Sequence, residues 1–281
     1  MIIDVHTHVF SPEVTMRREE YAANDVCFAQ LYGNAKAKLR TAEDLISEME
    51  DSGVNKAVIL NIGWGSHELC VRTNDYILEA ASRYPDRLIP FVSVQPAAGQ
   101  AALAELKRCA VAGARGLGEL RPDVQGFDLN DRRLIKPLVK TLTDLGMVMT
   151  CHADEPVGHH YPGKGTLTPD VLFPFIEAHP GLRLILSHWG GGLPFYGLMP
   201  EVEKALTNVW FDSAASPFLY QPEIFERVSE LVGADKILFG SDWPLLKQRR
   251  CLDELRATNL STWSMRSISG GNAAGMLGLS E

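Results

Sequence analysis

The sequence lacks several features that would indicate particular classes of protein. Its five cysteines are odd in number and scattered, and no two of them have a Cys-x-x-Cys spacing, which argues against a disulfide framework and a structural zinc site. Lys and Arg total 27 against 35 Asp and Glu, giving a formal net charge of −8 without any long run of one sign. We therefore do not expect nucleic acid or a membrane surface as a partner.

Long apolar runs are also absent. The longest are strand-sized, and the first residues do not combine a basic stretch with a long apolar one. Neither a membrane span nor a signal peptide is indicated, so we expect a cytoplasmic protein. With 281 residues and 46% hydrophobic content, the chain can bury a full core.

Eight apolar, strand-like segments alternate with helical segments along the chain. No Gly-x-Gly-x-x-Gly follows the first of them, so nothing marks the dinucleotide crevice of an open doubly wound sheet. The number and spacing of the units predict a single (β/α)8 TIM barrel over 1–281, with an inserted loop at 11–40 over the active site. The predicted strands are 1–10, 56–62, 88–94, 114–119, 146–152, 182–188, 208–212 and 236–242, and the helices are 41–52, 74–84, 99–112, 131–145, 169–178, 198–206, 222–232 and 265–277.

Residues that bind metals or transfer protons stand at the carboxyl ends of five predicted strands. His6 and His8 are two residues apart on a strand, so both imidazoles can point to one place. The active site of such a barrel lies at these strand ends. Because an unpaired buried charge costs several kcal/mol, chance is a poor explanation for this placement. The full set is His6, His8, Glu119, His152, His188 and Asp242.

This set of imidazoles and carboxylates suits a divalent metal. Zinc is the first expectation, and manganese, iron and nickel fit the same ligand types. A zinc ion with an open position lowers the pKa of bound water to about 7 and so produces hydroxide at neutral pH. Asp242 could then accept a proton from that water and return it to a leaving group, which is hydrolytic chemistry.

The sequence resembles the amidohydrolase superfamily. The segments Ile3-Asp-Val-His-Thr-His8, Leu184-Ile-Leu-Ser-His-Trp-Gly-Gly191 and Ile237-Leu-Phe-Gly-Ser-Asp-Trp-Pro244 are similar to its amidohydrolase-2 branch, which includes the aminocarboxymuconate-semialdehyde and resorcylate decarboxylases. The resemblance implies that the first metal is held by His6, His8, His152 and Asp242. It implies that His188 is either a ligand of a second metal or an acid/base facing the substrate.

Glu119 departs from the pattern of many hydrolases in this superfamily. They use a carboxylated lysine at the end of the fourth strand to bridge two metals, whereas this chain has Gly118-Glu119 there. A glutamate in this place resembles the TatD-like deoxyribonucleases and would allow two metal ions, whereas the decarboxylases work with one. The alternative is an ion pair between Glu119 and Arg115 or Arg121.

Three further residues are candidates for substrate binding. Arg121 could hold a substrate carboxylate through two hydrogen bonds, although a structural salt bridge explains it equally well. Trp243 follows Asp242 and could form a wall of the pocket, or pack between strand and helix. His160 lies on a glycine-containing loop, 153–167, near which substrate would enter, but loop histidines are commonly solvated.

From these residues we predict a metal-dependent hydrolase that acts on a small amide, lactone or ester, with Asp242 and His188 as catalytic groups and one or two zinc ions. The alternative is a non-oxidative decarboxylase of an aromatic or unsaturated carboxylic acid. A non-catalytic barrel and a phosphodiesterase are weaker alternatives, and the acidic chain argues against a large polyanionic substrate. A homodimer is common among soluble barrel enzymes, although no feature of the sequence establishes one.

Overall fold

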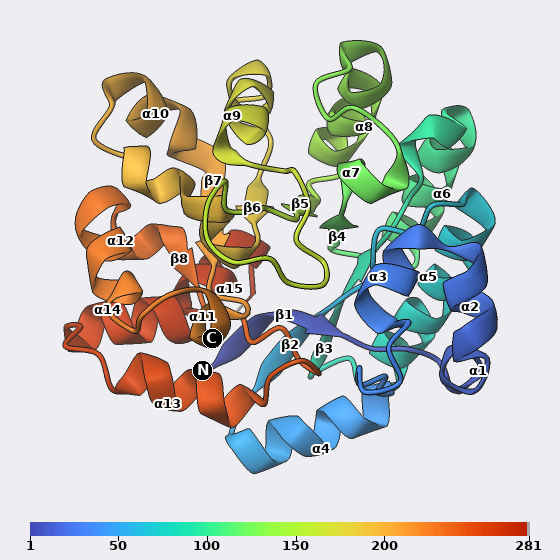
Figure 1. Ribbon diagram of the computed structural model, residues 1–281, viewed down its shortest axis with the longest axis horizontal. Helices are drawn as coiled ribbons and strands as arrows, with labels where there is room; N and C mark the ends of the chain where they lie inside the picture. The colour runs from blue at the N-terminus through green and yellow to red at the C-terminus, as the bar shows by residue number, and fades with distance from the viewer. Residues whose placement is uncertain (280–281) are drawn as a thin grey trace.

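The computed structural model describes residues 1–279, which form an eight-stranded parallel barrel surrounded by helices (Figure 1). Neighbouring strands pair in chain order. Hydrogen bonds from Asp242 N to His6 O (2.9 Å) and from Val5 N to Phe239 O (2.9 Å) connect the last strand to the first. The predicted TIM barrel is therefore confirmed. Its strands are β1 (Ile3–His8), β2 (Lys56–Leu60), β3 (Leu88–Val92), β4 (Gly116–Leu120), β5 (Val148–Cys151), β6 (Leu184–Leu186), β7 (Val209–Asp212) and β8 (Ile237–Leu238).

Helices follow the strands and cover the outside of the barrel. Their apolar faces pack on the strands, as in α4, where Thr41 and Asp44 form a capping box and Leu45 and Met49 are buried. The helices are α1 (Pro12–Met16), α2 (Arg18–Asn24), α3 (Val26–Tyr32), α4 (Ala42–Ser52), α5 (His67–Arg83), α6 (Gln100–Val111), α7 (Pro122–Gln125), α8 (Arg132–Asp144), α9 (Pro169–Ala178), α10 (Pro200–Ala205), α11 (Ser216–Leu219), α12 (Ile224–Val232), α13 (Gln248–Arg256), α14 (Thr262–Arg266) and α15 (Asn272–Leu277).

All eight strands are shorter than predicted, β6 and β8 most of all, and several helices were missed. Strand β6 ends at Leu186 and β8 at Leu238, because the backbone that follows turns to positive φ at His188 (55°) and Asp242 (64°). Both segments were assigned to the strands although Ser187-His188 and Gly240-Ser241-Asp242 are not apolar. The longest missed helix after the insertion is α13, where Cys251, Leu252 and Leu255 form the buried side, and the short helices α7 and α11 were missed as well.

The insertion at 11–40 is largely helical. Its helices α1 to α3 lie beside α5 at the edge of the barrel (Figure 1). They enclose a hydrophobic cluster in which the Tyr32 ring meets the Phe10 ring edge-on at 4.6 Å and Phe28 stacks on Trp64 at 5.4 Å. This aromatic packing holds the insertion on the barrel.

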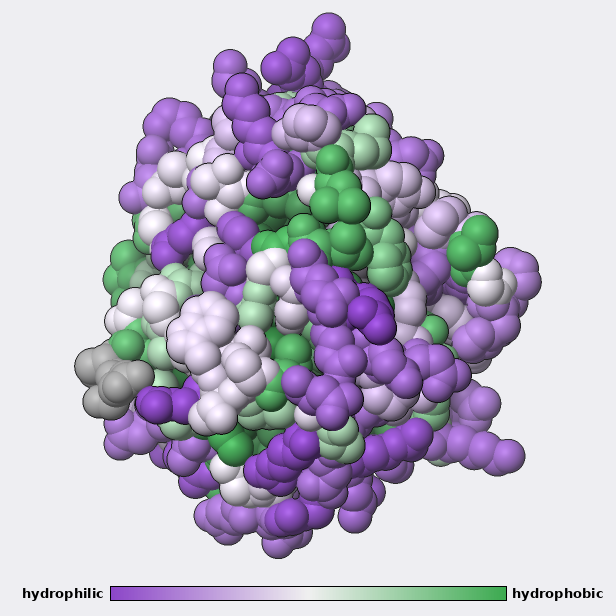
Figure 2. All heavy atoms as spheres, turned by 90° about the vertical axis from the view of Figure 1, so that its left-hand side faces the viewer, coloured by the Kyte–Doolittle hydropathy of each residue, from purple (hydrophilic) through white to green (hydrophobic). Residues whose placement is uncertain are grey.

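The surface over α10 and α12 is mainly hydrophilic, with some apolar side chains between the charged ones (Figure 2). Phe195, Leu198 and Met199 are exposed apolar residues of the segment that leads into α10. Among residues 1–279, no helix has the length and apolar character needed to cross a bilayer.

Candidate active site and metal centre

His6 and His8 converge at the carboxyl end of β1, as their spacing predicts. Their Nε2 atoms are 3.1 Å apart, and both side chains are buried. The carboxylate of Asp242, which follows β8, reaches the same place, with its Oδ1 3.8 Å from Nε2 of His6 and 3.7 Å from Nε2 of His8. The closure of the barrel between β8 and β1 brings these three side chains together.

Glu119 faces histidines rather than arginines. Its Oε1 lies 3.1 Å from Nδ1 of His152 and 3.6 Å from Nε2 of His188, whereas its Oε2 lies 4.0 Å from Nε2 of His6. The alternative of an ion pair with Arg115 or Arg121 is wrong: Arg115 donates to Leu277 O, and Arg121 donates to Gly163 O. The two carboxylate oxygens of Glu119 therefore point to two different groups of imidazoles.

Two aspartates that the sequence analysis missed orient these imidazoles. Asp212, at the end of β7, accepts a hydrogen bond from Nδ1 of His6 (2.9 Å), and Asp154 accepts one from Nε2 of His152 (3.1 Å). Both are fully buried. Asp212 ends a predicted strand, and Asp154 stands two residues after His152, the same spacing as His6 and His8. Those two positions were signals in the sequence.

The hydrogen bonds decide which ring nitrogens are free to bind a metal. His6 uses Nδ1 toward Asp212, His8 uses Nδ1 toward Leu60 O (3.3 Å), and His188 uses Nδ1 toward Ala214 O (3.1 Å). In the neutral rings, which are the forms that bind a metal, the Nε2 atoms therefore carry the lone pairs. Two such lone pairs face each other 3.1 Å apart between His6 and His8, which is unfavourable unless a cation binds both. The residues present thus fit a divalent metal.

Three groups of ligand atoms, each within 4.8 Å of one another, overlap in this site. They are His6, His8 and Glu119; His6, His188 and Asp242; and Glu119, His152 and His188. Every metal ligand proposed from the sequence belongs to at least one group. His152 belongs to the group with Glu119 and His188 and to neither of the two groups that contain His6.

The acidic residues favour positive charge at this site. Burial lowers the pKa of His6, but the charges of Asp212 and Glu119 outweigh it and raise the pKa to about 9. Burial likewise lowers the pKa of His188, whereas the charge of Glu119, whose Oε1 is 3.6 Å from Nε2 of His188, raises the pKa to about 10. Burial and the neighbouring charge of His6 lower the pKa of His8. Carboxylates that attract protons this strongly also attract a metal cation.

Irregular backbone places several of these side chains. His188 and Asp242 are two of four non-glycine residues with positive φ in the described chain, a conformation that costs free energy and often occurs at functional sites. The pairing register also shifts between Asp4 and Thr7 in β1 and between Leu117 and Leu120 in β4. His6 lies within the first irregularity and Glu119 within the second. Such bulges commonly redirect side chains next to active sites.

Arg121 is buried directly beyond Glu119, with only 1% of its surface exposed. Its Nη2 donates to Gly163 O at 2.6 Å and lies 3.6 Å from Oδ2 of Asp123. Within residues 1–279, its Nε and Nη1 have no hydrogen-bond partner. A buried guanidinium with two free donors is well suited to an anionic group of a ligand.

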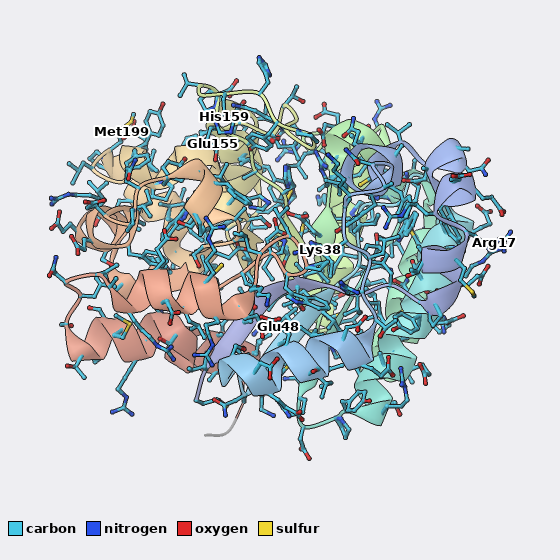
Figure 3. The ribbon with its side chains drawn as sticks, turned by 60° about the horizontal axis from the view of Figure 1, so that its bottom comes forward. Arg17, Lys38, Glu48, Glu155, His159 and Met199 are labelled. Atoms are coloured by element: carbon cyan, nitrogen blue, oxygen red, sulfur yellow. The ribbon has the colours of Figure 1, made fainter. Side chains whose placement is uncertain are left out.

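The other two candidates for substrate binding lie apart from this group. Trp243 is 5% exposed and packs in the hydrophobic layer with Ala42 and Leu45 of α4, so we assign it a packing role instead of a pocket wall. His160 is exposed on the loop between β5 and α9, close in the chain to Glu155 and His159. Figure 3 shows Glu155 and His159 on the opposite side of the molecule from Glu48 of α4.

Comparison with known proteins finds relatives along most of the chain. A gamma-resorcylate decarboxylase of Polaromonas sp. strain JS666 is 23% identical, over 77% of this chain and 78% of the relative. A 2-amino-3-carboxymuconate-6-semialdehyde decarboxylase of Dictyostelium discoideum is 21% identical, over 99% of this chain and 91% of the relative. These relatives are decarboxylases, so the prediction of a hydrolase is wrong and its alternative agrees better. The hydrolase prediction took the metal ligands as evidence for activated water, but the same ligands serve both reactions.

Solved structures share the fold. The crystal structure of 5-carboxyvanillate decarboxylase LigW from Sphingomonas paucimobilis matches with a TM-score of 0.80 at 15% identity, and covers 99% of both chains. A dihydroxybenzoic acid decarboxylase from Polaromonas sp. JS666, with bound manganese and the inhibitor 2-nitroresorcinol, matches with a TM-score of 0.74 at 20% identity over 99% of this chain and 96% of that one. At these sequence identities, the structural similarity establishes only that this chain has the same barrel fold.

A family model described as Amidohydrolase matches residues 3–279, nearly the whole chain. The match includes β1 with its two histidines, the ends of β4, β5 and β6, and Asp242 after β8. It agrees with the resemblance seen in the sequence and with the barrel closed around these residues. The chain is an enzyme of the amidohydrolase family, in the branch related to aminocarboxymuconate-semialdehyde decarboxylase.

Proposed function

We propose that this enzyme is a metal-dependent, non-oxidative decarboxylase of an aromatic or unsaturated carboxylic acid. The observation that carries the proposal is the buried, incompletely paired Arg121 beside a buried group of metal ligands. Arg121 and a metal ion held by these ligands would offer two positive centres to a substrate that has a carboxylate. The decarboxylases among the relatives support this assignment over hydrolysis.

Decarboxylation needs little from the protein beyond charge, orientation and one proton. The bond between the ring or chain carbon and the carboxyl carbon breaks, carbon dioxide leaves, and the electron pair stays on the substrate carbon. A bound divalent metal would supply positive charge that holds an oxygen of the substrate and favours this electron shift. Arg121 would orient the acid through its free Nε and Nη1 donors.

The proton for the vacated carbon would come from His188, or from Asp242 after its carboxylate has taken a proton from a water molecule. Both stand at strand ends beside the imidazole group, and His188 has its Nε2 turned inward. The side chain of Asp242 is 16% exposed, so it is the most accessible member of a site whose other ligands are nearly buried. Limited access of water lets the proton donor, rather than bulk solvent, complete the reaction.

The direct test is release of carbon dioxide from a panel of hydroxybenzoic and unsaturated dicarboxylic acids by protein loaded with zinc or manganese. In deuterium oxide, the product should carry deuterium at the carbon that lost the carboxyl group. Loss of carbon dioxide that stops on chelation and returns with metal would support the proposal. Turnover of lactones, with all acids left intact, would refute it.

Metal content provides a further prediction, because Glu119 faces both imidazole groups. After reloading with zinc or manganese, elemental analysis of Glu119→Ala should show a lower metal content than the unchanged protein. If Glu119 bridges two ions, two equivalents will fall to one. Equal metal content in both proteins would show that Glu119 does not bind metal.

A further inference from the structure

Asp154 connects the metal site to the loop that covers Arg121. Its Oδ1 accepts hydrogen bonds from Nε2 of His152 (3.1 Å) and from Gly165 N (2.7 Å), and its Oδ2 accepts one from Leu167 N (2.9 Å). Its own backbone N donates to Leu167 O at 2.9 Å. Asp154 therefore closes the base of the loop that runs from 154 to 167.

The two backbone donors decide the role of the Asp154 side chain. Because Gly165 and Leu167 both offer N–H groups, the carboxylate can only accept at this place. Nε2 of His152 must then carry a proton, which leaves Nδ1, 3.1 Å from Oε1 of Glu119, as the ring nitrogen that can bind a metal.

The same loop holds the arginine. Gly163, two residues before Gly165, accepts the 2.6 Å hydrogen bond from Nη2 of Arg121. Space under the loop is small: a Cβ at Gly165 would lie 2.0 Å from Oδ2 of Asp123, so any other residue there would force the Asp123 side chain to move. A change at Asp154 would thus reach both His152 and the loop over Arg121.

We propose that Asp154 is a positioning residue with two tasks: it presents Nδ1 of His152 to the metal, and it ties that ligand to the loop 154–167 that holds Arg121. The first task rests on the proposed metal-dependent function. Carboxylates behind metal-binding histidines typically change metal affinity by about 10- to 100-fold when they are removed. The second task predicts that the loop opens more readily when Asp154 is changed.

The test compares Asp154→Asn with Asp25→Asn. Asp25 is a matched control because it is also buried and accepts hydrogen bonds from two backbone N–H groups, those of Phe28 (2.8 Å) and Gly65 (2.7 Å), but has no hydrogen bond to a histidine. Zinc affinity is measured by competition with a chelator, and loop opening by amide hydrogen exchange. The asparagine NH2 must face either Leu167 N–H, which loses one native contact, or the donors at Gly165 and His152, which loses two.

We expect Asp154→Asn to bind zinc about 10- to 100-fold more weakly and to exchange faster in 155–167, with Asp25→Asn unchanged in both. Zinc affinity within twofold of the unchanged protein, or an equal loss in both variants, would overturn the proposal. Asp154→Ser serves the same comparison if the asparagine variant does not fold. Zinc binding without decarboxylation by the unchanged protein would refute the proposed function alone, since the affinity comparison does not depend on turnover.

Discussion

Asp242→Asn is expected to lower kcat for decarboxylation by about 10³-fold, within the range for loss of a positioned proton donor. Asparagine has nearly the same shape, and it tolerates the positive φ of 64° at this position better than most residues. The fold and the hydrogen bond from the residue 242 backbone to His6 O should therefore remain. The measurements are kcat, KM and metal content on the same preparation.

Metal content separates the two ways in which Asp242 could act. If the variant keeps its metal and loses kcat, Asp242 supplies the proton; if metal is lost as well, Asp242 acts mainly as a ligand. Asp253→Asn is the control, because Asp253 is an exposed acid on α13 that pairs with Arg256 at 3.3 Å. An Asp242→Asn enzyme with wild-type kcat would remove this residue from the mechanism.

Arg121→Met is expected to raise KM for the acid by about 10²-fold. A hydrogen bond to a charged group contributes about 1.5 to 3 kcal/mol, and two are expected between this side chain and the substrate. Arg121→Lys should show a smaller rise, since it keeps the charge but loses the planar pair of donors. Steady-state kinetics on the best acid of the panel give KM and kcat for each variant.

Thermal unfolding distinguishes substrate binding from a structural ion pair. Arg121→Met loses the hydrogen bond from Nη2 to Gly163 O but also removes two buried donors, Nε and Nη1, that have no partner within residues 1–279, so we expect the melting temperature to change little. Arg115→Met, at the other end of β4, is the control: Arg115 donates to Leu277 O, so this variant should melt earlier with normal KM. The opposite pattern, a destabilised Arg121→Met with unchanged KM, would contradict the assignment.

The local pattern of the sequence was sufficient to predict the barrel and the place of its site. Parallel strands buried on both faces require continuous apolar segments, and these are visible without any tertiary information. His6 and His8 could be paired because the side chains of a strand alternate with a period of two. The reaction was predicted wrongly, since a set of metal ligands is compatible with both hydrolysis and decarboxylation.

The sequence by itself therefore determined the fold, the location of the site at the carboxyl ends of the strands, and the types of metal ligand. Only the tertiary structure decided which partner each side chain has: Glu119 meets imidazoles rather than arginines, Asp212 and Asp154 orient His6 and His152, and Trp243 packs in the core. The physical reason is that burial and strand pairing depend on local periodicity, whereas these contacts join residues from separate strands and loops. Such contacts depend on backbone turns, such as those at His188 and Asp242, that the local pattern does not indicate.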